Sequence, residues 1–175
     1  MKKIFILLIL LFAFNLYSQA DWEKFTNEYP AFTLSFPGKI EQKNKAVTTD
    51  IGISNIITVY SVSSIDSTEN YFYLLSYYDF DPGIFSNDSL MTVEEYLTNM
   101  VQSIAEENKS KILYNNFVPD KNTPSMIFRI DNDEKSMKGK LIVSGNFIYS
   151  LQVFTVRQYS LNKNIDKFIN GFYLR

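Results

Sequence analysis

The sequence predicts an α+β domain in which helices pack on both faces of a mainly antiparallel sheet, as an α/β/α sandwich. Most strand-like segments follow one another through short turns, and this order favours antiparallel pairing. The strand expected over 70–80 is apolar on both faces, so it requires cover on both sides. Two amphipathic segments, around 93–104 and 161–169, are the helices that can provide this cover.

Residues 1–20 are expected to be a signal peptide. Lys2–Lys3 precede an apolar run of about 13 residues, whereas a membrane-spanning helix needs roughly 20. Ser18 and Ala20 place small residues at the −3 and −1 positions of a cleavage site. The alternative is an uncleaved anchor, which would be the chain's only attachment to a membrane. Residues 21–175 are then predicted to be one exported domain, periplasmic or extracellular.

The residue types that are missing exclude several classes of function. The chain has no Cys and no His, which excludes thiolate nucleophiles, Ser-His-Asp sites and thiolate ligation of zinc or iron–sulfur clusters. The predicted leader contains two of the 17 Lys and Arg residues and none of the 19 Asp and Glu residues. The rest of the chain therefore has a net charge of −4, which argues against nucleic-acid binding. No metal or other cofactor is expected.

The first part of the domain is expected to be extended. Apolar and polar residues alternate over 31–36, and this pattern predicts a strand with one apolar face: Phe32, Leu34 and Phe36. Pro37-Gly38 ends that strand in a type II turn. Segment 39–49 is polar and extended, and 53–62 is a strand rich in β-branched residues.

Four tyrosines are the candidate surface for a partner or ligand. Tyr71, Tyr73 and Tyr77 fall on one face of the strand over 70–80, and Tyr149 joins them if its strand is a neighbour. Tyrosine suits an interface because its ring buries apolar area while its hydroxyl stays in water. The alternative is that this face is a core covered by the C-terminal helix, with the hydroxyls reaching its edge.

Two helices are expected. The first begins after Thr92, which forms a capping box with Glu95. Its apolar face consists of six side chains at helical spacing: Val93, Tyr96, Leu97, Met100, Val101 and Ile104. The second helix ends near Gly171 and has four side chains on one face: Leu161, Ile165, Phe168 and Ile169. The apolar segment 172–174 that follows is expected to pack on the domain.

The remaining strands are expected over 112–118, 126–130, 140–144 and 147–156. The last two flank Gly145-Asn146. A two-residue Gly-Asn loop between such segments predicts a hairpin with a type II′ turn.

Several short sequences point together to a known family. They are Phe36-Pro37-Gly38-Lys39 at the end of the first strand, Phe147-Ile148-Tyr149 in the hairpin, and the closing Lys167-Phe168-Ile169-Asn170-Gly171-Phe172. With an antiparallel meander and one long helix between them, the chain resembles the PsbP-like superfamily.

That superfamily includes the extrinsic PsbP subunit of photosystem II and periplasmic DcrB-type proteins. The resemblance covers nearly all of 21–175. It implies helices on both faces of the sheet and a non-catalytic role in binding or assembly. PsbP-type metal sites use His, so no metal site is implied here.

Three local motifs have a structural and a functional interpretation. The acidic stretches Asp79–Asp81 and Asp131–Glu134 suggest a Ca²⁺ loop, but the second lacks the Gly and Glu of an EF-hand. Turns in which Asp and Asn bond their own backbone are the alternative. Asp66-Ser67-Thr68 and Asp88-Ser89-Leu90 resemble O-glycosylation sites of exported bacterial proteins. Three lysines form either a basic patch or a protected strand edge: Lys39, Lys43 and Lys45.

These observations predict an exported, non-catalytic binding or assembly module. Its partner is an unknown protein or small molecule of the cell envelope. One alternative is a small-molecule carrier that uses the tyrosine-rich face of the sheet. The other is a hydrolase that uses carboxylates or a Ser-Lys pair, although no acids are placed across a common cleft. The chain is therefore not expected to be an enzyme.

Overall fold

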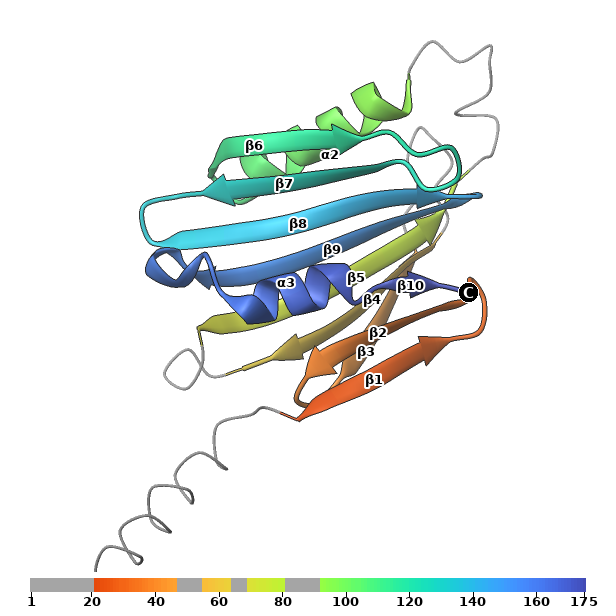
Figure 1. Ribbon diagram of the computed structural model, residues 1–175, viewed down its shortest axis with the longest axis horizontal. Helices are drawn as coiled ribbons and strands as arrows, with labels where there is room; N and C mark the ends of the chain where they lie inside the picture. Colours follow the sequence, from red (N-terminus) through yellow and green to blue (C-terminus); the bar gives the residue numbers. More distant parts are fainter. Residues whose placement is uncertain (1–20, 47–54, 64–68, 81–91) are drawn as a thin grey trace, which may run out of the picture.

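The computed structural model describes residues 21–46, 55–63, 69–80 and 92–175. In these ranges the chain forms a seven-stranded sheet, a three-stranded sheet, two α-helices and one short 3-10 helix (Figure 1). The predicted signal peptide, Asp81 and both Asp-Ser motifs lie outside the described residues, so the expectations about them stay predictions.

The large sheet has the strand order β3-β4-β5-β9-β8-β7-β6. Its strands are β3 (Glu41–Ala46), β4 (Asn55–Val62), β5 (Asn70–Asp79), β6 (Lys111–Val118), β7 (Ser125–Asp131), β8 (Lys135–Ser144) and β9 (Phe147–Val156). Every pairing is antiparallel, which confirms the predicted mainly antiparallel class. The doubly apolar strand is β5, and it lies between β4 and β9 inside the sheet.

The small sheet was not expected as a separate layer. It consists of β1 (Trp22–Asn27), β2 (Phe32–Pro37) and β10 (Tyr173–Leu174), with β2 in the middle. The apolar face predicted for β2 is real, because Phe32, Leu34 and Phe36 are buried. Gly38 has a φ of +75°, as a turn after Pro37 requires.

Both predicted helices are present. Helix α2 (Val93–Glu107) is capped at its N-terminus by Thr92, and Thr92 and Glu95 form the predicted capping box. Helix α3 (Lys163–Asn170) begins at Asn162, whose side chain accepts hydrogen bonds from two backbone N–H groups of the first turn. Leu161 is therefore outside the helix, and its side chain is 86% exposed rather than on the buried face. The 3-10 helix η2 (Arg157–Tyr159) precedes this cap.

Two hydrophobic cores lie on opposite faces of the large sheet. We call them the aromatic core and the helix core. The small sheet and α3 contribute six buried side chains to the aromatic core: Phe32, Leu34, Phe36, Ile165, Phe168 and Ile169. Helix α2 contributes three to the helix core: Leu97, Val101 and Ala105. In Figure 1, α3 lies in front of the large sheet and α2 behind it. The finer α/β/α sandwich remains a prediction, since the small sheet provides much of the cover on one face.

The β8–β9 hairpin is the turn that the sequence predicted. Ser144 pairs with Phe147 across the two-residue loop. Gly145 has a φ of +55°, and Asn146 is not among the residues with positive φ, which fits a type II′ turn. Within the described ranges, neither helix has the length and hydropathy that crossing a bilayer would require.

Candidate functional site

A bulge near the start of β5 decides where the predicted tyrosines lie. Asn70 and Phe72 pair with the consecutive β9 residues Thr155 and Phe154. Tyr71 is therefore an extra residue in β5, and such a residue changes the face on which the following side chains lie. The Tyr71 ring lies 6.4 Å from that of Phe154, and both side chains line a groove beside α2.

The four candidate tyrosines do not share one accessible surface, which corrects the prediction. Tyr73, Tyr77 and Tyr149 belong to the aromatic core and are 3%, 2% and 1% exposed. Burial raises the pKa of Tyr73 and of Tyr149 to about 12. Tyr71 is only half-buried and lies apart from them. The alternative interpretation, a covered core, describes three of the four side chains.

The groove has a volume of about 530 Å³ and lies where α2 ends beside the large sheet. This volume is within the range of ligand-binding pockets, about 300 to 1,000 Å³. Its floor is apolar and is formed by six side chains: Val62, Tyr71, Phe72, Ile130, Met137 and Phe154. Its polar rim comes from the end of α2, the α2–β6 connection, the β7–β8 turn and the start of β8: Glu107, Asn108, Lys109, Ser110, Asn132 and Lys135.

Lys109 lies at this rim in a backbone conformation that usually belongs to glycine. Its φ is +49°, and among the described residues other than glycine it alone has a positive φ. The Lys109 N–H donates to the Glu106 carbonyl at 3.0 Å, and the Ser110 N–H donates to the Ala105 carbonyl at 2.9 Å. These bonds form a Schellman motif, which favours Gly at this position. A residue with a Cβ there costs about 1 to 2 kcal/mol.

The second rim cation, Lys135, lies over an aromatic ring. Its Nζ is 5.9 Å from the centroid of the Tyr71 ring, within reach of a cation–π interaction. Burial raises the pKa of the Tyr71 hydroxyl above its ordinary value. Neither Lys109 nor Lys135 forms an ion pair with a described carboxylate.

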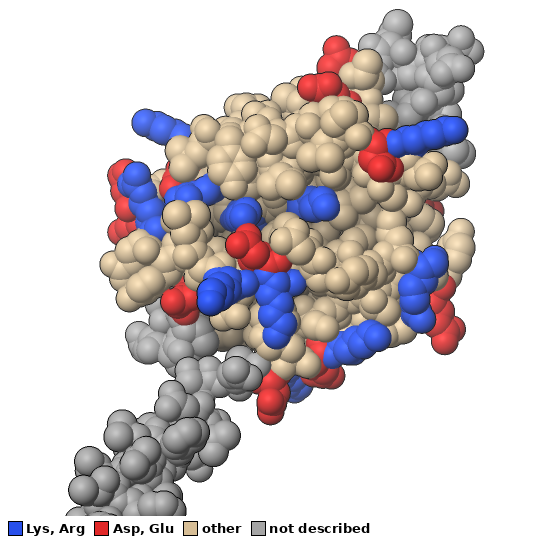
Figure 2. Space-filling view, viewed as in Figure 1, with Lys and Arg blue, Asp and Glu red and all other residues tan. Residues whose placement is uncertain are grey.

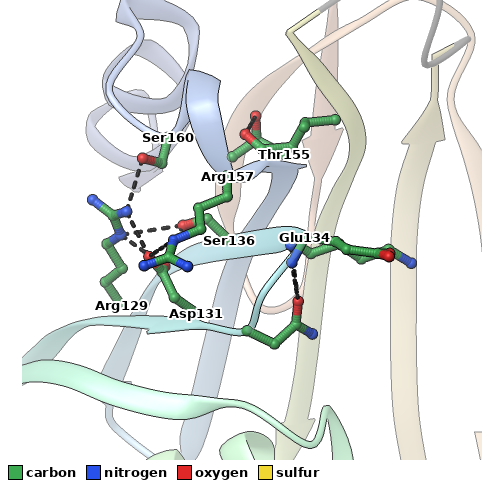
Figure 3. Close-up of polar contacts among 10 residues, drawn as sticks. Arg129, Asp131, Glu134, Ser136, Thr155, Arg157 and Ser160 are labelled. Carbon is green, nitrogen blue, oxygen red and sulfur yellow. Dashed lines mark hydrogen bonds and ion pairs between the residues drawn. The ribbon is translucent and has the colours of Figure 1, made fainter.

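Sequence reasoning missed a buried polar cluster on the other side of β7 and β8 (Figure 3). Arg129 donates to both carboxylate oxygens of Asp131 at 2.9 and 2.7 Å, and to the hydroxyl of Ser160 at 2.8 Å. The Ser136 hydroxyl donates to Asp131 at 2.6 Å and accepts from Arg129 at 3.1 Å. The network therefore connects the segment after η2 to the large sheet. One signal was available, because Arg129 and Asp131 are two apart on one strand and share a face.

Asp131 remains ionised in this cluster. Burial opposes its ionisation, but the hydrogen bonds from Arg129 and Ser136 outweigh burial and hold the pKa of Asp131 below its usual value. Its neighbour Asn132 accepts backbone hydrogen bonds from Glu134 and Lys135 at 3.1 and 2.8 Å. These contacts match the turn interpretation of the acidic stretch. No cluster of three potential metal-ligating side chains exists in the part of the chain that the structure describes.

Two of the three lysines of the predicted basic patch lie on an edge strand of the large sheet, and Lys39 lies before that strand. Lys43 and Lys45 are on β3, an edge strand whose six residues are all exposed. Lys43 Nζ lies 5.1 Å from the Tyr60 ring centroid, and the Tyr60 hydroxyl donates to Glu41 at 2.7 Å. This placement matches the protected-edge interpretation. On the face that carries α3, basic and acidic side chains are mixed (Figure 2).

The architecture matches a solved structure. The solution structure of cyanobacterial PsbP (CyanoP) from Synechocystis sp. PCC 6803 superposes with a TM-score of 0.57. The match covers 91% of this chain and 95% of that one, at 9% sequence identity. The fold is PsbP-like. This finding confirms the resemblance that the sequence suggested, and at such low identity the PsbP-like likeness concerns the fold alone. No family model and no curated protein matches the chain.

Proposed function

We propose that the protein is an exported, non-catalytic binding or assembly module, and that the groove at the end of α2 is its binding site. The observation that carries the proposal is the combination of an apolar floor with two rim lysines that have no described acidic partner. Binding sites combine apolar area with a few polar groups in this way. The predicted leader and the PsbP-like fold support the exported and non-catalytic parts of the proposal.

The polar cluster around Asp131 supports a structural role rather than a catalytic one. A serine nucleophile needs a base that can take its proton. The Ser136 hydroxyl instead donates to a carboxylate that two hydrogen bonds from Arg129 keep ionised. Within the described ranges, no lysine hydrogen-bonds to the Ser136 hydroxyl. The hydrolase alternative therefore gains no support from these residues.

A small-molecule carrier is the second candidate, and the size of the groove favours it. The tyrosine face first considered for such a ligand is covered, so the carrier site also moves to the groove beside α2. A carrier would be stabilised by its ligand in a thermal-shift screen with lipids, glycans and peptides.

We further propose that the fold is layered with helices on both faces of the large sheet, and that α2 and α3 are the outer elements.

Site-specific photo-crosslinking in intact cells tests the proposed function. A photo-reactive amino acid would replace Val62, which is 66% exposed at the groove, and, as a matched control, Leu161 outside it. The proposal predicts one reproducible crosslinked partner from the Val62 position that is absent from the Leu161 position. If both positions give the same products, or neither gives any, the groove is not the site of a stable partner.

A further inference from the structure

The groove offers three kinds of contact at once. Its floor is apolar, and its two lysines come from different elements, Lys109 from the α2–β6 connection and Lys135 from the start of β8. Of the described residues that line the groove, one is acidic, Glu107. Among these lining side chains, two ammonium groups stand against one carboxylate, which gives the lining a net charge of +1, although the chain as a whole is acidic. A ligand that complements it has an apolar body and a negative group.

The side-chain amides of Asn108 and Asn132 add hydrogen-bonding groups to the rim. A purely apolar ligand would leave these groups unused. Asn108 donates through its Nδ2 to the Ile104 carbonyl at 2.8 Å, which leaves its Oδ1 as an acceptor. Asn132 accepts through its Oδ1 from two backbone N–H groups, which leaves its Nδ2 as a donor. A donor and an acceptor that line the same groove match the C=O and N–H of a peptide backbone.

Lys109 places a cation at the rim in a backbone conformation that costs stability. Gly would occupy the left-handed position without strain, yet the chain has a long basic side chain there. Strained positions concentrate at functional sites. The second cation, Lys135, is held near the floor by the Tyr71 ring rather than by an acid, so an incoming anion would not have to displace a carboxylate from it.

From these contacts we infer that the groove binds the carboxyl-terminal end of a partner polypeptide whose last side chain is apolar. The apolar side chain lies on the floor of Phe72 and Phe154, the terminal carboxylate accepts from Lys109 and Lys135, and the rim amides bond the peptide backbone. This inference rests on the proposed binding function and names the segment of the partner that is bound.

The test uses the isotope-labelled protein as purified from the cells that express it. Its ligands are two pools of acetylated tetrapeptides that end in Leu, Ile, Val or Phe. The acid pool has a free terminal carboxylate and the matched amide pool has a terminal amide, so the two pools differ only in that charge. Binding is followed by NMR through the amide signals of Lys109 and Lys135, with Thr26 on β1 as a distant control. We expect the acid pool to shift the groove signals and the amide pool to bind at least tenfold more weakly.

Two variants locate the contact. Lys109→Gly removes the ammonium and relaxes the backbone, and Lys135→Gln removes the other charge. Each is expected to weaken binding of the acid pool about three- to tenfold. Lys24→Gln makes the same change of charge at an exposed position on β1, away from the groove, and is expected to have no effect.

The outcomes separate this inference from the proposed function. Equal binding of the acid and amide pools would overturn the role of the terminal carboxylate. Binding of dodecanoate but not of either peptide pool would replace the peptide with a small amphiphile. If no probe binds while the Val62 crosslink still captures a partner, the inference fails and the proposed function stands. If the Val62 position also captures no partner, both the inference and the proposed function are contradicted.

Discussion

Strand β5 faces two environments, and they differ in how completely they are covered. On one side, Tyr73 and Tyr77 lie under the small sheet and α3 in a core dominated by aromatic rings. On the other, α2 covers the helix core but ends beside Tyr71 and leaves a groove. The extra residue in β5 places Tyr71 on the groove side rather than with Tyr73. An aromatic cluster in a sequence therefore marks a binding surface only where the fold leaves it uncovered.

The largest effect is expected from opening the covered side. Phe32 is fully buried, and its ring lies 5.0 Å from that of Tyr77, 5.7 Å from that of Tyr149 and 5.4 Å from that of Phe172. Phe32→Ala should lower the free energy of unfolding by about 3 to 5 kcal/mol, because it leaves a cavity between the sheets. Urea denaturation measures this change. A loss below about 1 kcal/mol would mean that the small sheet is not a firm cover.

Breaking the polar cluster should cost somewhat less and should depend on pH. Asp131→Asn leaves Arg129 without its anion, and we expect a loss of about 2 to 3 kcal/mol at pH 7. The folded pKa of Asp131 is lowered, so its contribution is fully present above the unfolded pKa of about 3.9. It is lost as the pH falls through the folded pKa. The difference between variant and parent in unfolding free energy should therefore shrink from pH 7 to pH 2; a constant difference would contradict the assignment.

The connection of α3 to the covered side gives a smaller effect. Asn70 and Asn162 exchange two side-chain hydrogen bonds of 2.9 and 2.8 Å, and Asn70 also donates to the Tyr73 hydroxyl. Asn162→Ala removes this pair and the helix cap, so we expect a loss of about 2 kcal/mol. A double-mutant cycle with Asn70→Ala should show that the two losses are not additive. Strict additivity would mean that the amide pair contributes nothing.

On the open side, one substitution should increase stability. Lys109→Gly relieves the left-handed strain at the end of α2, and we expect a gain of about 0.5 to 1 kcal/mol after the greater flexibility of unfolded Gly is subtracted. Lys109→Ala is the matched control, because it removes the same charge but keeps the strain. Thermal unfolding of both variants distinguishes the two causes. Equal stability of the two would show that the backbone at this position is not strained.

Local patterns predicted much of this fold. The alternation of Phe32, Leu34 and Phe36, the Thr92–Glu95 capping box and the Gly145-Asn146 turn all depend on residues close in sequence. The sequence did not reveal which distant segments pair. Tyr173 and Leu174 form a strand only because β2 offers them an edge, and this creates the small sheet that covers the tyrosines.

The candidate site was predicted less well for the same reason. The bulge after Asn70 moves Tyr71 away from Tyr73, and a period-two pattern cannot reveal an inserted residue in one strand. Leu161 continued the apolar spacing of α3, but the Asn162 cap begins the helix after it. The groove combines residues from β4, β5, β7, β8, β9 and the end of α2, so its lysines come together only in the folded chain.

Tyrosine nitration mapped by mass spectrometry tests the contrast between the two sides most directly. Tyr29, whose side chain is 83% exposed, is the internal standard for free access. We expect Tyr73, Tyr77 and Tyr149 to stay unmodified and Tyr71 to react more slowly than Tyr29. We also expect the acid peptide pool to protect Tyr71 alone. Nitration of the three buried tyrosines at the rate of Tyr29, or an unprotected Tyr71 in the presence of a bound peptide, would contradict these expectations.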